Sequence, residues 1–127
     1  PILNSKVNTL LINAYHRTNN IDSTLAILGR EEKANPTDDK LIAQRAIIAD
    51  EKGYADVALD AYSELIDRKV PYSNIVLEKR AKIYLKNDDY SRASKDMEEA
   101  KKLDPNSQKI KNTSIEIDSK IKENKND

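Results

Sequence analysis

The sequence predicts an all-α protein built from repeated pairs of helices, and three observations support this. Apolar residues recur at intervals of three and four along most of the chain, a spacing that places them on one face of an α-helix. The 127 residues include only 2 Gly, no Phe and no Trp, and the abundant Ala, Leu, Lys and Glu favour helices over strands. Pro36 and Pro105 lie 69 residues apart, close to twice the roughly 34-residue period of a helical-hairpin repeat.

The clearest predicted helix begins at Tyr90 and ends before Pro105. Tyr90, Ala93, Met97 and Ala100 are spaced three, four and three residues apart, so they share one face. Large side chains alternate with small ones along this face. A neighbouring helix can therefore approach closely at the alanines.

Six further helices follow from the same spacing and from residues that begin or end a helix. The first is expected at about residues 3–17 and the last at about 107–123, with a polar tail, 124–127, that frays. Asp22 or Ser23 is expected to cap the second helix, and Thr37 or Asp38 the third. Gly53 is expected to end the third helix, and Ser73 or Asn74 to begin the fifth.

The helices fall into three repeats. Ala58 and Ala93 lie 35 residues apart, which fits a period of about 34 with one residue inserted near Ser73. The repeats are expected at residues 5–38, 39–72 and 74–107. The helix at about 107–123 is apolar on one side only, so it is expected to cover the last repeat as a cap.

These residues resemble the tetratricopeptide repeat family, whose pattern places small and aromatic residues at fixed positions and closes each repeat with Pro. The third repeat matches through Ala81, Tyr84, Tyr90, Ala93, Met97, Ala100 and Pro105. The second matches through Ala46, Gly53, Ala58 and Tyr62, and departs at Leu65 and Val70. The first keeps Tyr15 and Pro36 but has Thr24 and Glu31 at the two Ala positions.

The resemblance covers about residues 5–107 and implies a single domain, a right-handed α-α superhelix of three hairpins plus the C-terminal capping helix. A generic helical bundle, or another helical solenoid of similar period, is the alternative. The chain begins at Pro1 without a Met or a signal sequence, so we expect a fragment of a longer protein.

Composition argues against several functions. The 22 Lys and Arg balance 22 Asp and Glu, which does not favour binding to nucleic acid, and no stretch is apolar enough for direct insertion into a membrane. The chain has no Cys and a single His, and it lacks a calcium-loop pattern and a glycine-rich phosphate loop. We therefore expect neither an enzyme nor a cofactor or metal site. The Asn112-Thr113-Ser114 triplet fits the N-glycosylation pattern, which is frequent in Asn-rich chains.

The family resemblance implies a concave groove lined by the first helix of each repeat, where some members hold the C-terminal carboxylate of a partner peptide. Carried over by position, Asn13 and Lys79 are suitable and Gln44 replaces an Asn, whereas Thr9 and Ile75 stand where two Lys are expected. The predicted peptide-binding residues are Asn13, His16, Arg17, Gln44, Ile47, Lys79, Lys82 and Lys86.

The cations in this set favour an acidic peptide or a free carboxylate. Alternatively, the lysines form an ordinary solvated face with Glu78 nearby to offset their charge. The chain is accordingly predicted to be a protein-interaction module that binds a peptide or a partner helix. The alternative is a structural or docking segment of a larger protein, such as an enzyme or an envelope-associated lipoprotein.

Overall fold

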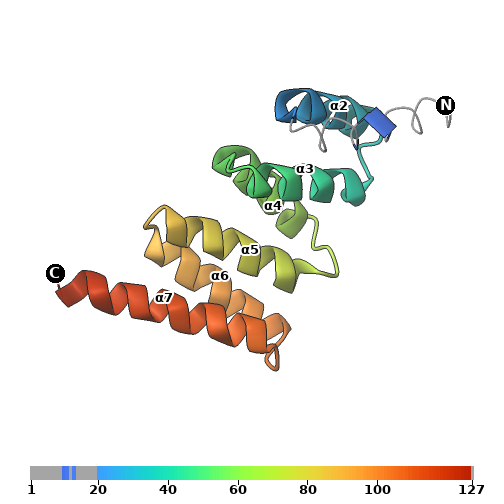
Figure 1. Ribbon diagram of the computed structural model, residues 1–127. Coiled ribbons are helices and arrows are strands. Elements are labelled where there is room, and N and C mark those ends of the chain that lie inside the picture. Colours follow the sequence, from blue (N-terminus) through green and yellow to red (C-terminus); the bar gives the residue numbers. More distant parts are fainter. Residues whose placement is uncertain (1–9, 12, 14–19, 127) are drawn as a thin grey trace. The chain divides into compact units, whose positions relative to one another are not determined.

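The computed structural model describes residues 10, 11, 13 and 20–126, and in this part of the chain the regular elements are helices without strands (Figure 1). The helices are α2 (Ile21–Ala34), α3 (Asp39–Glu51), α4 (Ala55–Asp67), α5 (Ser73–Lys86), α6 (Tyr90–Leu103) and α7 (Gln108–Asn126). The predicted all-α class is therefore confirmed. Most of the helix predicted at 3–17 lies outside the described residues, although Leu10, Leu11 and Asn13 are helical.

The chain divides into two compact units, Pro1–Glu64 and Leu65–Asp127, called here the N-terminal and the C-terminal unit. The boundary falls within α4. The division of the sequence into three repeats of one domain stays a prediction.

Local sequence explains where the helices begin. Asp38 caps α3 as predicted, because its Oδ1 accepts a hydrogen bond from the Lys40 N–H at 3.0 Å. The prediction for α2 was wrong: Asn20, and not Asp22 or Ser23, is the cap and accepts from the Ser23 N–H at 3.5 Å. The earlier start places Ile21 inside the helix, where its side chain is buried.

Local sequence also explains other helix boundaries. Gly53 adopts a φ of 81°, the left-handed conformation expected of a glycine that follows a helix. As predicted, α5 begins at Ser73, whose hydroxyl donates a hydrogen bond to the Val70 carbonyl at 2.6 Å. The last helix, predicted at about 107–123, corresponds to α7, which reaches Asn126, and Ile121 near its end packs against the core. Fraying of the polar tail stays a prediction.

Each unit has its own hydrophobic core. In the N-terminal unit, Ile21, Ile27, Leu28 and Ile48 form a buried cluster between α2 and α3. In the C-terminal unit, α5, α6 and α7 lie side by side and share a second cluster (Figure 1). The buried members of this second cluster are Leu77, Ala81, Ala93, Met97, Ala100, Ile110 and Ile117.

Two arginines that stand 35 residues apart, Arg45 and Arg80, join helices through carboxylates. Arg45 on α3 bonds to Glu32 of α2 at 2.8 Å and to Asp60 and Glu64 of α4, each at 3.1 Å. Burial lowers the pKa of Arg45, but its hydrogen bonds to Glu32 and Asp60 outweigh burial and raise the pKa above its usual value. Arg45 therefore remains charged and ties α3 to α2 and α4, and Arg80 of α5 makes the corresponding ion pair with Asp96 of α6.

The alanines of α6 provide a test of the packing. Ala93 is completely buried in the core of the C-terminal unit, so Ala93→Leu should overpack this core and reduce the free energy of unfolding by about 1–3 kcal/mol. Ala26→Leu, at an exposed position of α2, is the matched control and should change stability by less than about 0.5 kcal/mol. Urea unfolding measures both. Equal midpoints for the two variants would mean that Ala93 does not lie in a close helix contact.

Candidate functional site

The exposed side of α5 carries the three lysines of the predicted peptide-binding set. Ile75, Lys79, Lys82 and Lys86 are spaced four, three and four residues apart, so they share one side of the helix. Ile75 is 50% exposed, Lys82 and Lys86 are exposed, and Lys79 is half-buried. Leu77 and Ala81 of the same helix are in the core. This side, called here the α5 face, thus combines three ammonium groups with one exposed apolar side chain.

The other predicted site residues belong to the N-terminal unit. Gln44 and Ile47 are exposed on α3, 35 residues before Lys79 and Lys82. Asn13 is helical and exposed, whereas His16 and Arg17 lie outside the described residues. The structure places the three lysines together on α5 and places Gln44 with Ile47 on α3. A groove that joins the two sets stays a prediction.

Glu78 was predicted only as a nearby charge that offsets the lysines, but in the structure it is buried and makes two specific contacts. It is only 2% exposed, although it lies beside the α5 face. Its Oε1 atom lies 3.3 Å from the Nζ atom of Lys82 and accepts a hydrogen bond from the Thr113 hydroxyl of α7 at 3.0 Å. The four-residue spacing of Glu78 and Lys82 could have indicated the ion pair. The contact with Thr113 could not have been found in this way, because it joins residues 35 positions apart.

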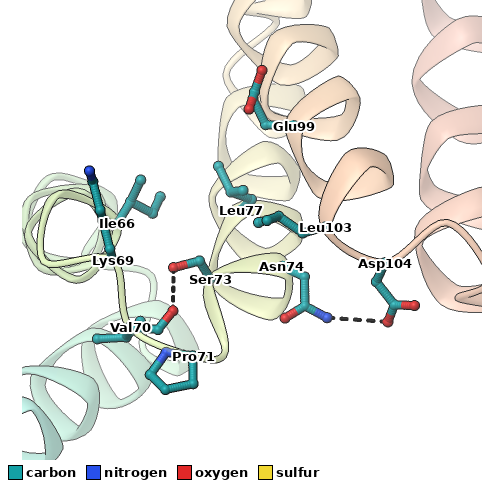
Figure 2. Close-up of a pocket in the computed structure, with 10 residues that line it drawn as sticks. All are labelled: Ile66, Lys69, Val70, Pro71, Ser73, Asn74, Leu77, Glu99, Leu103 and Asp104. Carbon is teal, nitrogen blue, oxygen red and sulfur yellow. Dashed lines mark hydrogen bonds between the residues drawn. The ribbon is translucent and has the colours of Figure 1, made fainter.

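A pocket of about 680 Å³ lies at another place in the C-terminal unit (Figure 2). Figure 2 shows that the end of α4, the following loop, the start of α5 and the end of α6 enclose it. Its lining is mainly apolar, and Leu103, which is 58% exposed, forms part of the rim. Lys69 borders it from the loop, and Glu99 and Asp104 border it from the α6 side. The Asn74 side-chain amide donates a hydrogen bond to Asp104 at 3.2 Å and so connects α5 with the end of α6.

None of the six predicted site residues that the structure describes lines this pocket. Sequence reasoning missed it because four separate segments contribute to the lining, and none of them carries a recognisable motif. An apolar side chain of a partner would fit the lining chemically, so the pocket is a competing location in any binding experiment.

Neither a metal site nor a membrane span is found within the described part of the chain. Over residues 10, 11, 13 and 20–126, no three His, Cys, Asp or Glu side chains are grouped so that they could hold a metal ion. None of the helices α2–α7 combines the length and the apolar character that a membrane-crossing helix requires.

Comparison with known proteins assigns the fold. No family model matches the chain, and no curated protein matches it in sequence. The solved structures that resemble it include the first TPR of Spaghetti (RPAP3) bound to the HSP90 peptide SRMEEVD, with a TM-score of 0.73 and 19% identity over 91% of this chain and 90% of that one. The first TPR domain of human RPAP3 gives a TM-score of 0.74 and 19% identity over 94% of both chains.

The TPR domain of Arabidopsis OM64 is similar as well, with a TM-score of 0.69 and 19% identity over 91% of this chain and 94% of that one. The predicted fold class, an all-α helical repeat of the tetratricopeptide type, is therefore confirmed. At 19% identity this similarity establishes the fold and does not identify a ligand of this chain.

Proposed function

We propose that this chain is a non-enzymatic protein-interaction module that binds an acidic peptide segment along the α5 face. The observation that carries the proposal is the alignment of Lys79, Lys82 and Lys86 with the exposed Ile75 on one side of α5. Ammonium groups form strong, charge-assisted hydrogen bonds with carboxylates, and Ile75 offers the peptide an apolar contact at the N-terminal end of the lysine row.

One of the similar structures supports a peptide as the partner. The TPR of Spaghetti was solved with the peptide SRMEEVD, which contains two Glu and ends in Asp. A peptide of this composition has the charge that the α5 face of the present chain would attract. The predicted binding residues of the N-terminal unit stay a separate prediction, and the proposal rests on the α5 face alone.

The proposal predicts micromolar binding that depends on the lysines. We use SRMEEVD with a free carboxyl group as the acidic probe, and the same peptide with Gln and Asn in place of its acidic residues as the neutral probe. The acidic probe should bind with a Kd on the order of micromolar, since a short peptide loses conformational freedom on binding. Lys79→Ala and Lys82→Ala should each weaken binding about three- to tenfold, because each removes a charge-assisted contact. Fluorescence anisotropy of a labelled peptide measures the affinity.

Three controls make this result specific. Lys109→Ala removes an exposed lysine of α7 outside the α5 face and should leave the Kd unchanged. Raising the salt concentration should weaken binding of the acidic probe more than binding of the neutral one, because salt screens exposed charges. Leu103→Lys tests the pocket of Figure 2. If Leu103→Lys abolishes binding while Lys79→Ala and Lys82→Ala do not change it, the peptide occupies the pocket and the proposed site is wrong.

A further inference from the structure

We infer that Glu78 acts as an internal competitor for Lys82, and that Thr113 of α7 sets the strength of this competition. A carboxylate of a bound peptide must then compete with Glu78 for the Lys82 ammonium. Glu78 and Thr113 would therefore determine how strongly the α5 face binds acidic segments. The inference rests on the proposed function, and it assigns that function two determinants that do not belong to the predicted binding residues.

The geometry places three groups around one carboxylate oxygen. The Oε1 atom of Glu78 accepts the Thr113 hydroxyl at 3.0 Å and lies 3.3 Å from the Lys82 Nζ atom. The Glu78 and Thr113 residues are 2% and 3% exposed, whereas the side chain of Lys82 is 46% exposed. The Lys82 ammonium therefore contacts a buried carboxylate and is at the same time accessible to solvent on the α5 face.

This arrangement differs from an ordinary surface ion pair. An exposed pair at this spacing contributes little, because water solvates both charges when they separate. Glu78 has little access to water, and a buried carboxylate that loses its partner becomes unfavourable. Releasing Lys82 from Glu78 is therefore more costly than releasing a lysine from an exposed glutamate.

The Glu78 carboxylate lowers the affinity for an acidic peptide even if Lys82 contacts both Glu78 and the peptide. An ammonium group has three donors, so Lys82 can contact Glu78 and a peptide carboxylate at once. The two carboxylates then lie on the same ammonium and repel each other. Competition and repulsion both lower the affinity for an acidic peptide, so removal of the Glu78 charge should raise it.

Thr113 modulates this effect from the far side of the carboxylate. Its hydroxyl stabilises the negative charge of Glu78 whether or not Lys82 is present. Without this donor, Glu78 depends more strongly on Lys82 and holds it more tightly. Loss of the hydroxyl should therefore weaken peptide binding, although Thr113 is buried in α7 and does not belong to the α5 face.

The first test is Glu78→Gln, which keeps the shape of the side chain and an oxygen that can accept from Thr113. The affinity for the acidic probe should rise about three- to tenfold, the size expected for relief of one charge-assisted contact. Glu98→Gln, at an exposed position of α6, produces the same change in net charge and should leave the Kd within about twofold, because exposed charges are screened. An unchanged or weaker affinity in Glu78→Gln would overturn the inference.

The second test is Thr113→Val, which removes the hydroxyl and keeps the branched shape. Affinity for the acidic probe should fall about two- to threefold, and this effect should disappear in the Glu78→Gln/Thr113→Val double variant, because coupled residues are not additive. Ser114→Ala is the matched control. Ser114 is a buried neighbour whose Oγ has no hydrogen-bond partner among the described residues, so its replacement should leave binding unchanged. An effect of Thr113→Val that persists in the double variant would contradict a role through Glu78.

A measurement without any peptide separates this inference from the proposed function. Trace acetylation of lysine amines, read by mass spectrometry, should label Lys82 faster in Glu78→Gln and slower in Thr113→Val than in the wild type, since an amine held in an ion pair is less available. The exposed Lys95 of α6 is the internal reference. Unchanged labelling of Lys82 in Glu78→Gln would overturn the inference even if the peptide binds as proposed.

The binding and labelling results together identify which statement fails. If the wild type binds the acidic probe and Glu78→Gln does not tighten binding, the inference is overturned and the proposed function stands. If no variant binds the acidic probe although labelling of Lys82 rises in Glu78→Gln, the ion pair is real. Its role in binding is then overturned together with the proposed function for this peptide.

Discussion

Removal of residues 107–127 should strongly destabilise the C-terminal unit and lower its solubility. The buried Ile110 and Ile117 of α7 belong to the same core as Leu77 and Met97, and Tyr84 packs against that core. Loss of each fully buried isoleucine forfeits about 1.5–3 kcal/mol of hydrophobic stabilisation. Two such losses approach the lower end of the roughly 5–15 kcal/mol by which small domains are stable. Thermal unfolding and size-exclusion chromatography of the shortened chain measure the effect.

A single substitution tests the same contact without exposing the whole core. Ile117 is 1% exposed, so Ile117→Ala should reduce the free energy of unfolding by about 2–5 kcal/mol. Ile115→Ala removes the same atoms from a side chain of α7 that is 63% exposed, and it should change stability by less than about 0.5 kcal/mol. If the shortened chain remains monomeric and equally stable, α7 does not cover the core and the capping role is refuted.

Arg80→Met should be the second strongly destabilising change. Arg80 on α5 makes two hydrogen bonds to Asp96 of α6, at 2.8 and 2.6 Å, and the Asp96 side chain is only 7% exposed. The hydrogen bond to Asp96 raises the pKa of Arg80 above its usual value, so the guanidinium stays charged. Without this cation the buried carboxylate loses its partner. We expect a loss of about 3 kcal/mol, the low end of the range for broken buried pairs because Arg80 is itself 18% exposed.

Two further variants isolate the cause of this loss. Lys95→Met removes an exposed cation from α6 and should be nearly neutral. The double variant Arg80→Met/Asp96→Leu removes both charges and should recover much of the lost stability, because an apolar pair leaves no buried charge. Urea unfolding measures all three variants. A double variant that is less stable than Arg80→Met would show that the ion pair itself, and not the orphaned carboxylate, accounts for the effect.

The positions of the helices were predictable because they depend on neighbours within one turn. The spacing of Ala93, Met97 and Ala100 defines the buried side of α6, and Asp38 and Gly53 mark helix ends through local backbone geometry. The error at α2 concerned its first residue only. Asn20 caps this helix in place of the predicted Asp22 or Ser23, and the buried Ile21 lies in the first turn.

The candidate site was predictable only in part. The order of Lys79, Lys82 and Lys86 along one side of α5 follows directly from their spacing. The buried state of Glu78 does not, because it depends on α7 and on Thr113, 35 residues further along the chain. The pocket of Figure 2 also required the folded chain, since its hydrogen bond between Asn74 and Asp104 spans 30 residues. Short-range spacing therefore specified the helices, their buried sides and the order of their charges, whereas which charges are buried and where a cavity remains depended on packing between distant segments.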